Sequence, residues 1–320
     1  MAKVTRDGFT IETKPEKSFY FIGVTTSKSS IMKLFPLWMK ELGYPQIKIY
    51  PYDLKIHDAT VNYRQAVAQI KYDKDCYGAL VTTHKMDLYA AAKDMFDYFD
   101  SYALLLDEIS CISKNNGRLE GHAKDPITSG ASFDRFIKKD YFAKTGAHIL
   151  IFGAGGSSIA TILHLVNKKD KSDRPEKIIV INRSQPRLDH ISEILKKVKT
   201  DISVELICSS DPEKNDKVKQ TLPEHSIVIN ATGMGKDTPG SPVSENGLFP
   251  KNGWAWEFNY RGELDFIHQA EKQKESRGVK IEDGWIYFIN GWTQVIFQVL
   301  HLDMTPGIFK RLEKIANSIK

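Results

Sequence analysis

The sequence predicts an α/β protein built as two domains. Apolar runs of strand length alternate with segments that are apolar at helical spacing, which is the pattern of parallel sheets with helical crossovers. A glycine-rich turn at Gly153–Gly156 stands between a predicted buried strand and a predicted helix near the middle of the chain. The 320 residues suit two modest domains or one large domain.

The composition argues against several classes of protein. Hydrophobic residues make up 41% and charged residues 27%, as in ordinary globular proteins. The net charge of +5 includes no concentrated basic tract, so an anionic small molecule explains it at least as well as nucleic acid. The three cysteines are widely spaced, which disfavours a disulfide framework or a zinc site. No signal-like start and no run of about 18 apolar residues is present, so a cytoplasmic protein without a membrane span is expected.

The first half of the chain begins with a polar lead-in at residues 1–17. Alternating apolar runs and helically spaced segments follow it. Gly43 fits the C-cap of the first helix, and residues 110–122 are predicted to form a hairpin around a type I′ turn at Asn116-Gly117. The predicted strands are Ser18–Val24, Ile47–Tyr52 and Gly78–Thr82, and the predicted helices are Ile31–Leu42 and Val61–Ile70.

A polar cluster follows the first predicted strand. Ser27, Lys28 and Ser29 stand between the end of that strand and the start of a helix. Hydroxyls, a cation and free backbone amides at such a place could hold a carboxylate. Capping of the helix by Ser29 or Ser30 is the alternative.

Two charged residues also follow predicted strands. Lys85 stands just past the carboxyl end of a strand, where α/β sheets place their ligands, although a lone lysine is commonly a solvated surface charge. Asp125 comes directly after the predicted hairpin and before Pro126, and a helix cap is its simplest role.

The glycine turn is the central feature of the second half. Residues Ile149–Phe152 form an apolar run, after which Gly153 allows a tight turn and Gly155 leaves room for a pyrophosphate. Ser157 and Ser158 open the next helix, whose free N–H groups favour an anion. Ser158 takes the third position of G-x-G-x-x-G, so the context of strand and helix strengthens the motif. Nucleotide binding on a Rossmann-type domain is predicted, with an ordinary strand–turn–helix corner as the alternative.

The end of the next predicted strand, Lys177–Ile181, indicates which dinucleotide is bound. An acidic residue at this place would accept a hydrogen bond from the ribose of NAD. The sequence instead has Asn182 and Arg183, with Arg187 one turn later. Cations here suit a 2′-phosphate and predict NADP, and a pair of surface arginines is the alternative.

The remaining elements complete the second half. Small residues at Ala231–Gly235 follow a strand, where they either make room for a cofactor or form a turn. Asn290 and Gln294 share one face of a long apolar helix and either satisfy buried backbone groups or bind a ligand. The predicted strands are Val204–Cys208, Ser226–Asn230 and Trp254–Tyr260, and the predicted helical segments are Gly130–Lys144, Leu188–Lys197, Leu264–Lys274 and Phe288–Leu300.

Together these pieces resemble the shikimate dehydrogenase family, in the family's order and from about Phe21 to about Leu300. Ser27-Lys28-Ser29 is similar to the family's S-x-S, whose serines hold the substrate carboxylate. Val81–Lys85 resembles V-T-(I-P)-H-K, which places Thr82 near the substrate and makes Lys85 catalytic. Gly121–Asp125 resembles G-x-N-T-D, whose aspartate, here Asp125, is the partner of the lysine.

The second half carries the rest of the resemblance. Three segments are similar to G-A-G-G-x-x-x-A, N-R-T-x-x-R and I-N-A-T-P-x-G, and they begin at Gly153, Asn182 and Asn230. Tyr260 falls on a tyrosine near the substrate, and Asn290–Gln294 falls on Q-G-A-x-Q, so Asn290 and Gln294 are expected at the substrate. The resemblance implies NADP as cofactor, bound by Gly153, Ala154, Gly155, Gly156, Ser157, Asn182, Arg183, Ser184, Arg187, Ala231, Thr232 and Gly233.

The chain departs from the family where the family binds substrate hydroxyls. Leu80 and Ala123 replace two asparagines, and Asn290 replaces a longer glutamine. The loop before Lys85 is one residue short and lacks its proline. Because a site built to bond hydroxyls discriminates strongly, losing these amides should change the preferred substrate.

The resemblance implies reversible hydride transfer between NADP(H) and a cyclic hydroxy acid, such as shikimate and 3-dehydroshikimate in aromatic amino acid biosynthesis. It implies a substrate domain at residues 1–128, an NADP-binding Rossmann domain at 129–286, and C-terminal helices at 287–320 that return to the substrate domain. The expected partner is a small-molecule carboxylate, with no metal, nucleic acid or membrane, and the chain is expected to be a monomer or homodimer. A paralogue acting on quinate, an amino-substituted analogue or another cyclic hydroxy acid, and a non-catalytic nucleotide-binding regulator, are the alternatives.

Overall fold

The computed structural model describes residues 3–236 and 238–320, and it confirms the predicted α/β class with two sheets of six strands. Its contacts divide the chain into two units. The first comprises residues 1–124 and 291–320, and the second comprises residues 125–290. The border falls inside helix α12 (Trp285–Val299).

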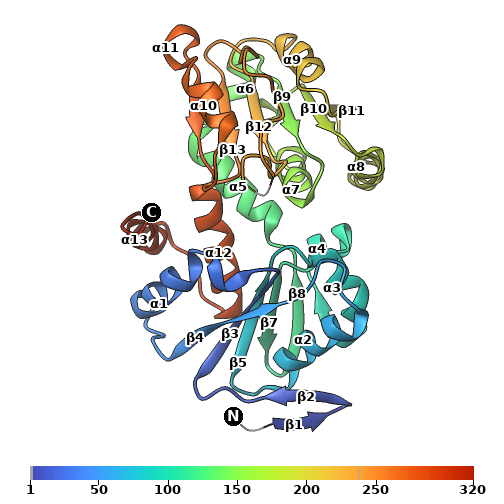
Figure 1. Ribbon diagram of the computed structural model, residues 1–320, viewed down its shortest axis with the longest axis vertical. Coiled ribbons are helices and arrows are strands. Elements are labelled where there is room, and N and C mark those ends of the chain that lie inside the picture. The colour runs from blue at the N-terminus through green and yellow to red at the C-terminus, as the bar shows by residue number, and fades with distance from the viewer. Residues whose placement is uncertain (1–2, 237) are drawn as a thin grey trace. The chain divides into compact units, whose positions relative to one another are not determined.

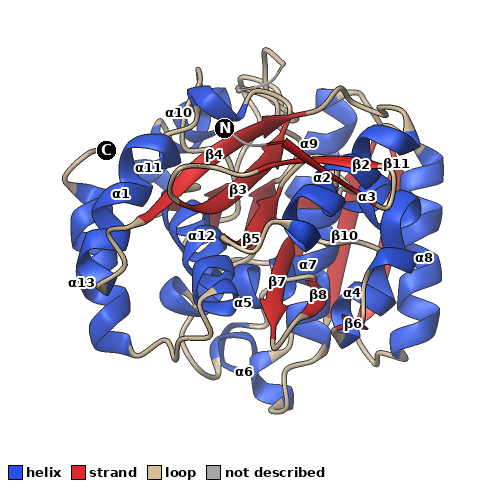
Figure 2. Ribbon diagram, turned by 90° about the horizontal axis from the view of Figure 1, so that it is seen from below, coloured by secondary structure: helices blue, strands red, loops and turns tan. Residues whose placement is uncertain are grey.

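The first unit is built on a mixed sheet in the order β4-β3-β5-β7-β8-β6. All neighbouring strands are parallel except the pairs that involve β7. Figure 2 shows the succession of β4, β3, β5, β7 and β8 in red. The strands are β3 (Lys17–Gly23), β4 (Ile47–Asp53), β5 (Cys76–Val81), β6 (Tyr98–Phe99), β7 (Cys111–Asn115) and β8 (Arg118–His122).

Helices cover the two faces of this sheet, with α1 on one side and α2 and α3 on the other (Figure 1). Helix α1 spans the predicted residues and ends at Gly43, whose φ of +86° is the left-handed conformation of a C-cap. Its fully buried Trp38 donates a hydrogen bond to the carbonyl of Leu312, in α13. The helices of this unit are α1 (Ile31–Leu42), α2 (Thr60–Tyr72), α3 (Lys85–Ala92), α4 (Ser101–Leu106) and α13 (Pro306–Asn317).

The amino-terminal segment differs from the predicted polar lead-in. It forms a two-stranded antiparallel sheet of β1 (Lys3–Arg6) and β2 (Phe9–Glu12). Gln65 and Gln69 of α2 bond the backbones of Thr10 and Glu12, and Ile11 is buried in the core of the unit. Side chains far along the chain therefore order a segment whose own pattern is weak.

The second unit has a parallel sheet in the order β11-β10-β9-β12-β13-β14. Numbered within this unit, that order is 3-2-1-4-5-6, which is the doubly wound Rossmann order. The strands are β9 (Ile149–Phe152), β10 (Lys177–Asn182), β11 (Ser203–Cys208), β12 (Ile227–Asn230), β13 (Trp254–Glu257) and β14 (Lys280–Glu282). Its helices besides α12 are α5 (Asp125–Phe136), α6 (Tyr141–Thr145), α7 (Gly156–Val166), α8 (Gln185–Val198), α9 (Pro212–Gln220), α10 (Asp265–Glu271) and α11 (Lys274–Arg277).

Three predicted elements of the second unit were wrong in extent. The helix predicted at Gly130–Lys144 breaks after Phe136, and Asp140 takes a left-handed φ of +62° before α6 begins. The segment predicted at Leu264–Lys274 is two helices, α10 and α11, which stop and restart around Lys272. The strand predicted at Trp254–Tyr260 ends at Glu257, where its pairing with β12 ends at Asn230.

Candidate functional site

A cavity of about 470 Å³ opens at the carboxyl ends of the strands in the second unit. Strand β9 pairs with β10 on one side and with β12 on the other, so the strand order reverses at β9, which is where sheets of this type bind ligands. Nine of the twelve residues predicted to bind NADP line the cavity: Gly153, Ala154, Gly155, Asn182, Arg183, Ser184, Arg187, Ala231 and Thr232. Gly156, Ser157 and Gly233 are their chain neighbours and do not line it.

The glycine turn has the geometry that its sequence predicted. Gly153 has a φ of +103°, and a Cβ there would lie 2.6 Å from the carbonyl oxygen of Ala231. Gly155 is the N-cap residue of α7, and the nearest atom to a Cβ there would be Nη1 of Arg187 at 3.8 Å. The backbone around Gly155 is therefore open toward the cavity at the positive end of a helix, where an anion is favoured.

Two exposed arginines border the same cavity. Arg183 follows β10 and Arg187 lies in the first turn of α8. The amide nitrogen of Asn182 donates to the carbonyl of Ser184 at 3.2 Å, which fixes the turn between them. Within the described ranges, neither arginine forms an ion pair. Both cations are thus available to a phosphate.

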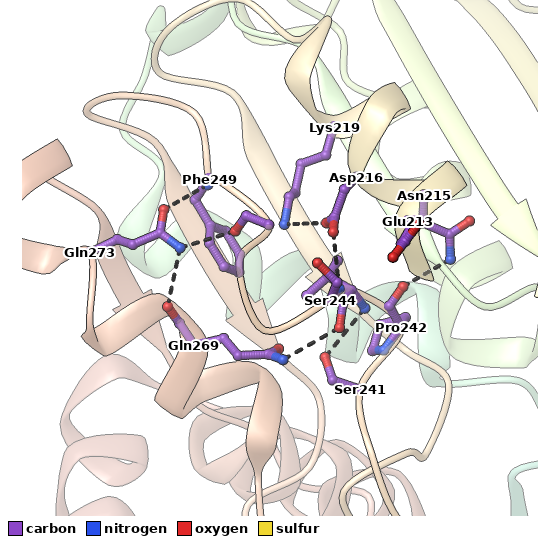
Figure 3. Close-up of polar contacts among 12 residues, drawn as sticks. Glu213, Asn215, Asp216, Lys219, Ser241, Pro242, Ser244, Phe249, Gln269 and Gln273 are labelled. Carbon is purple, nitrogen blue, oxygen red and sulfur yellow. Dashed lines mark hydrogen bonds and ion pairs between the residues drawn. The ribbon is translucent and has the colours of Figure 1, made fainter. Parts of the chain in front are cut away.

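Pro212 and Asn215 of α9, with Ser241 and Pro242, also line the cavity. Figure 3 shows the polar contacts that hold α9 against the segment Ser241–Phe249. Asn215 donates its amide to the carbonyl of Pro242 at 2.8 Å, and an oxygen of Asp216 accepts from the backbone of Ser244 at 3.1 Å. Nζ of Lys219 lies 3.0 Å from Asp216 and 4.3 Å from the ring centre of Phe249. Burial lowers the pKa of the Lys219 ammonium, and the Asp216 carboxylate opposes that shift.

This part of the cavity lining was missed by the sequence analysis. Helix α9 is polar along its length, so it lacks an apolar stripe. The signal that could have found it is local: Asp211 caps the helix through the backbone of Glu213 and Lys214, and Pro212 follows at the first helical position.

In the first unit, the predicted carboxylate-binding serines lie around the short 3-10 helix Thr26–Lys28. Ser27 is exposed and Ser29 is half-buried. Asp53 fixes the turn by accepting from the backbone and hydroxyl of Thr26 at 2.8 and 2.5 Å. Ser30 occupies the N-cap position of α1 without a side-chain cap bond. The side chain of Ser30 therefore does not cap α1, although capping by Ser29 or Ser30 was the alternative to carboxylate binding.

The predicted catalytic residues each follow a strand of the first sheet. Strands β5 and β8 run in the same direction because both are antiparallel to β7, so their carboxyl ends lie at one edge. Lys85 begins α3 after β5, and Asp125 begins α5 after β8. Both residues are half-buried. The pairing of the two side chains stays a prediction.

The two positions at which the chain lacks the asparagines of the family are buried. Leu80 and Ala123, which replace the two asparagines of the family, are 6% and 0% exposed. Thr82 is half-buried, and its hydroxyl bonds the carbonyl of Ile22 at 3.3 Å. The surroundings of the predicted substrate residues are therefore partly apolar.

The remaining predicted substrate residues are divided between the units. In the second unit, Tyr260 packs on the rings of Trp285 and Phe288. The amide nitrogen of Asn290 donates to Ser132 at 3.0 Å and to the carbonyl of Ile286 at 3.1 Å. In the first unit, Gln294 contacts the sulfur of Met304 at 3.9 Å. The Asn290 amide nitrogen is thus bonded within its own unit.

Residues 3–236 and 238–320 contain neither a metal-binding cluster nor a membrane-spanning helix. No group of three or more His, Cys, Asp or Glu side chains there could hold a metal ion. None of the helices there has the length and apolar character needed to span a bilayer.

The chain is similar in sequence to shikimate dehydrogenases and in fold to shikimate and quinate dehydrogenases. A shikimate dehydrogenase (NADP(+)) of Lactococcus lactis is 28% identical over 189 residues, which cover 59% of this chain and 61% of that protein. A shikimate 5-dehydrogenase of Listeria monocytogenes, solved with shikimate and NAD, superimposes with a TM-score of 0.70 at 17% identity, covering 98% and 99% of the two chains. A quinate dehydrogenase of Corynebacterium glutamicum, solved with NAD, gives 0.70 at 17% identity over 95% and 99%.

No model of a protein family matches the chain. In sequence, the match spans less than two thirds of the curated relative, whereas in fold it spans nearly the whole of the solved structures. The likeness in sequence is to proteins named shikimate dehydrogenase (NADP(+)), and the likeness in structure shows the fold. The resemblance predicted from the motifs is confirmed: the chain is similar in sequence to shikimate dehydrogenases and shares the fold of their solved structures.

Proposed function

We propose that the chain is an NADP-dependent oxidoreductase that transfers hydride reversibly between NADP(H) and a cyclic hydroxy acid or its keto form. The observation that carries the proposal is the cavity in which an open glycine turn and two unpaired arginines of the described chain lie together. The curated relatives named shikimate dehydrogenase (NADP(+)) support the same cofactor and make shikimate and 3-dehydroshikimate the first candidate substrates.

The cavity residues fit a phosphorylated dinucleotide. A side chain at Gly155 would fill space beside the helix end, so the bare backbone there suits a pyrophosphate. Arg183 and Arg187 suit the 2′-phosphate that distinguishes NADP from NAD. When bound, the dinucleotide supplies the hydride acceptor or donor.

The proposed roles of the residues that follow strands of the first sheet concern the substrate. Ser27 and Ser29 would hold its carboxylate through their hydroxyls. Lys85 and Asp125 would flank the reacting oxygen, and one of them would take the hydroxyl proton as the substrate is oxidised and return it during reduction. An ammonium beside a carboxylate couples the two titrations, so the role of base belongs to the pair.

A second candidate is the same reaction on a related cyclic hydroxy acid. The apolar, buried Leu80 and Ala123 favour it because they replace amides that would bind substrate hydroxyls. Quinate, an amino-substituted analogue and other cyclic hydroxy acids belong in the same test.

The test is an assay of NADPH formation from NADP+ with a panel of these acids, repeated with NAD+. We expect oxidation of at least one acid with NADP+ preferred. Arg183→Ala with Arg187→Ala should lower kcat/KM for NADP+ by roughly tenfold to a hundredfold, since two charge-assisted contacts are lost, and should leave the NAD+ value nearly unchanged. Lys196→Ala, at the far end of α8, is the control.

Two outcomes would contradict the proposal. Tight NADP binding without oxidation of any acid would favour a nucleotide-binding regulator. If the chain bound neither NADP nor NAD, it would not use a nicotinamide cofactor.

A further inference from the structure

A closed circuit of hydrogen bonds joins the ends of β12 and β13 in the second unit. Glu257 accepts from the amide nitrogen of Asn230 at 2.6 Å and from the backbone of Asn259 at 2.8 Å. The amide oxygen of Asn230 accepts from the backbone and hydroxyl of Thr232 at 3.2 and 2.7 Å. The Thr232 hydroxyl accepts from the backbone of Met234, whose carbonyl accepts from the side chain of Asn259 at 3.1 Å.

The circuit lies directly behind the cavity wall. Thr232 and Met234 both line the cavity, whereas Asn230 and Glu257 are fully buried behind them. Asn259 is also buried, and it immediately precedes Tyr260, which was predicted to lie near the substrate. One buried network thus fixes the cavity wall and the start of the Tyr260 loop.

The carboxylate sets the direction of the bonds around the circuit. An amide side chain has one accepting oxygen and one donating nitrogen. Because the Glu257 carboxylate only accepts, it turns the nitrogen of Asn230 toward itself and the oxygen of Asn230 toward Thr232. Asn230 and Glu257 are paired residues on neighbouring strands, so the two side chains start from a fixed separation.

We propose that Glu257 is a positioning residue for dinucleotide binding: its carboxylate, through Asn230, holds Thr232 and Met234 in the shape that the cofactor contacts. This inference rests on the proposed function, because it takes the cavity to be the cofactor site. Glu257 touches neither the cavity nor a reacting group, so its effect falls on cofactor affinity more than on the chemical step.

The deciding experiment exchanges the two polar groups of the circuit. In Glu257→Gln, an amide nitrogen, which can only donate, replaces one accepting oxygen, so either the bond from Asn230 or the bond from Asn259 is lost. In Asn230→Asp, two carboxylates face each other. The double variant with both changes restores the pattern, because the amide introduced at position 257 can donate to the carboxylate introduced at position 230 and still accept from Asn259.

We expect each single variant to raise the Kd for NADP+ by roughly tenfold at about pH 8, as lost buried hydrogen bonds do. The double variant should return Kd to within about threefold of the wild type, and kcat at saturating NADP+ should change less than Kd throughout. Tyr141→Phe is the matched control, because it removes a bond to the carbonyl of His225, just before the opposite end of β12. It should lower stability and leave Kd unchanged.

The outcomes separate this inference from the proposed function. A wild-type protein that binds no NADP+ overturns the proposed function. If the wild type binds NADP+ and both single variants bind it with the same Kd, the role of Glu257 is overturned. A double variant whose Kd is no lower than that of the single variants overturns it as well. Should Glu257→Gln fail to fold, Asn259→Ala decides the matter, because it removes the side-chain bond to Met234 that closes the circuit and should also raise Kd.

Discussion

The carboxyl of Glu257 is fully buried, and burial raises its pKa to about 7 although Asn259 and Asn230 donate hydrogen bonds that oppose the shift. A folded pKa above the unfolded value of 4.5 means that folding favours the protonated form. The stabilisation from this group is therefore complete below about pH 4.5 and is lost as the pH rises through 7. The loss amounts to about 3 kcal/mol.

The Glu257→Gln variant should consequently show a pH-dependent gain in stability. Its free energy of unfolding, relative to wild type, should rise by about 3 kcal/mol between roughly pH 4.5 and pH 8, because only the wild type must ionise a buried acid. Urea unfolding at several pH values measures this difference. Glu193→Gln, on an exposed position of α8, is the control. A pH-independent difference would contradict the assigned shift. Stability and cofactor affinity would thus respond to Glu257 in opposite directions, which is common at functional positions.

Lys85→Ala tests the proposed proton transfer. Turnover should fall by roughly a hundredfold to ten-thousandfold, the usual value of general acid–base catalysis, and NADP affinity should change little. Steady-state kinetics and NADP+ titration measure the two quantities. Lys93→Ala, at an exposed lysine that follows the same helix, should keep wild-type turnover. Wild-type turnover in Lys85→Ala would remove Lys85 from the chemistry.

Helix α9 depends on one buried ion pair. The side chain of Lys219 is 0% exposed and that of Asp216 is 8% exposed, and Asp216 also accepts from the backbone of Ser244. In Lys219→Met the side chain at this position keeps a similar volume, but the Asp216 carboxylate loses its counter-charge. We expect a loss of about 3 kcal/mol or more in the free energy of unfolding, as when one partner of a buried pair is removed.

Urea unfolding of Lys219→Met and Lys217→Met measures that loss, since Lys217 lies on the same helix and is exposed. Equal stability of the two variants would show that the pair contributes nothing. Because Asn215 of this helix holds Pro242 in the cavity wall, Lys219→Met should also weaken NADP binding.

The positions of most strands and helices along the chain were predictable, because they follow from local patterns. The run before Gly153 and the spacing of Ile31, Leu34 and Phe35 mark a strand and a helix without reference to the rest of the chain. The turn at Asn116-Gly117 takes positive φ at both residues, as its sequence requires. These features depend on neighbouring residues alone.

What could not be predicted depends on partners distant in the sequence. The β1–β2 hairpin is ordered by Gln65 and Gln69 of α2, and the wall at Pro242 is held by Asn215 of a polar helix. The circuit through Glu257 requires knowing that Asn230 and Glu257 are neighbours across two strands. Motif spacing located the residues on the cavity but gave no information on the buried groups behind them.

The division into two units allows the ligand assignments to be tested separately. The proposed cofactor residues of the cavity all belong to residues 125–290, whereas Ser27, Ser29 and Lys85 belong to the other unit. NADP+ alone should therefore slow amide hydrogen exchange around Gly153–Gly155, Asn182–Arg187 and Ala231–Met234. A substrate acid alone should slow exchange around Thr26–Ser30 and Thr82–Lys85, because a ligand suppresses the local openings of the segment that it contacts.

Exchange measured by mass spectrometry, with each ligand alone and at saturation, gives the answer. Residues Met95–Tyr98 and Lys171–Asp173, which belong to neither predicted site, are the internal controls and should exchange at the same rate throughout. Protection of the Thr26–Ser30 segment by NADP+ alone, or of the glycine turn by the acid alone, would contradict the assignment of the serine cluster to the substrate and of the glycine turn to the cofactor. Protection of the Thr26–Ser30 and Thr82–Lys85 segments by the acid, and of the glycine turn by NADP+, would show that these two sets of residues bind different ligands, as the sequence motifs imply, because each set lies at strand ends of a single sheet.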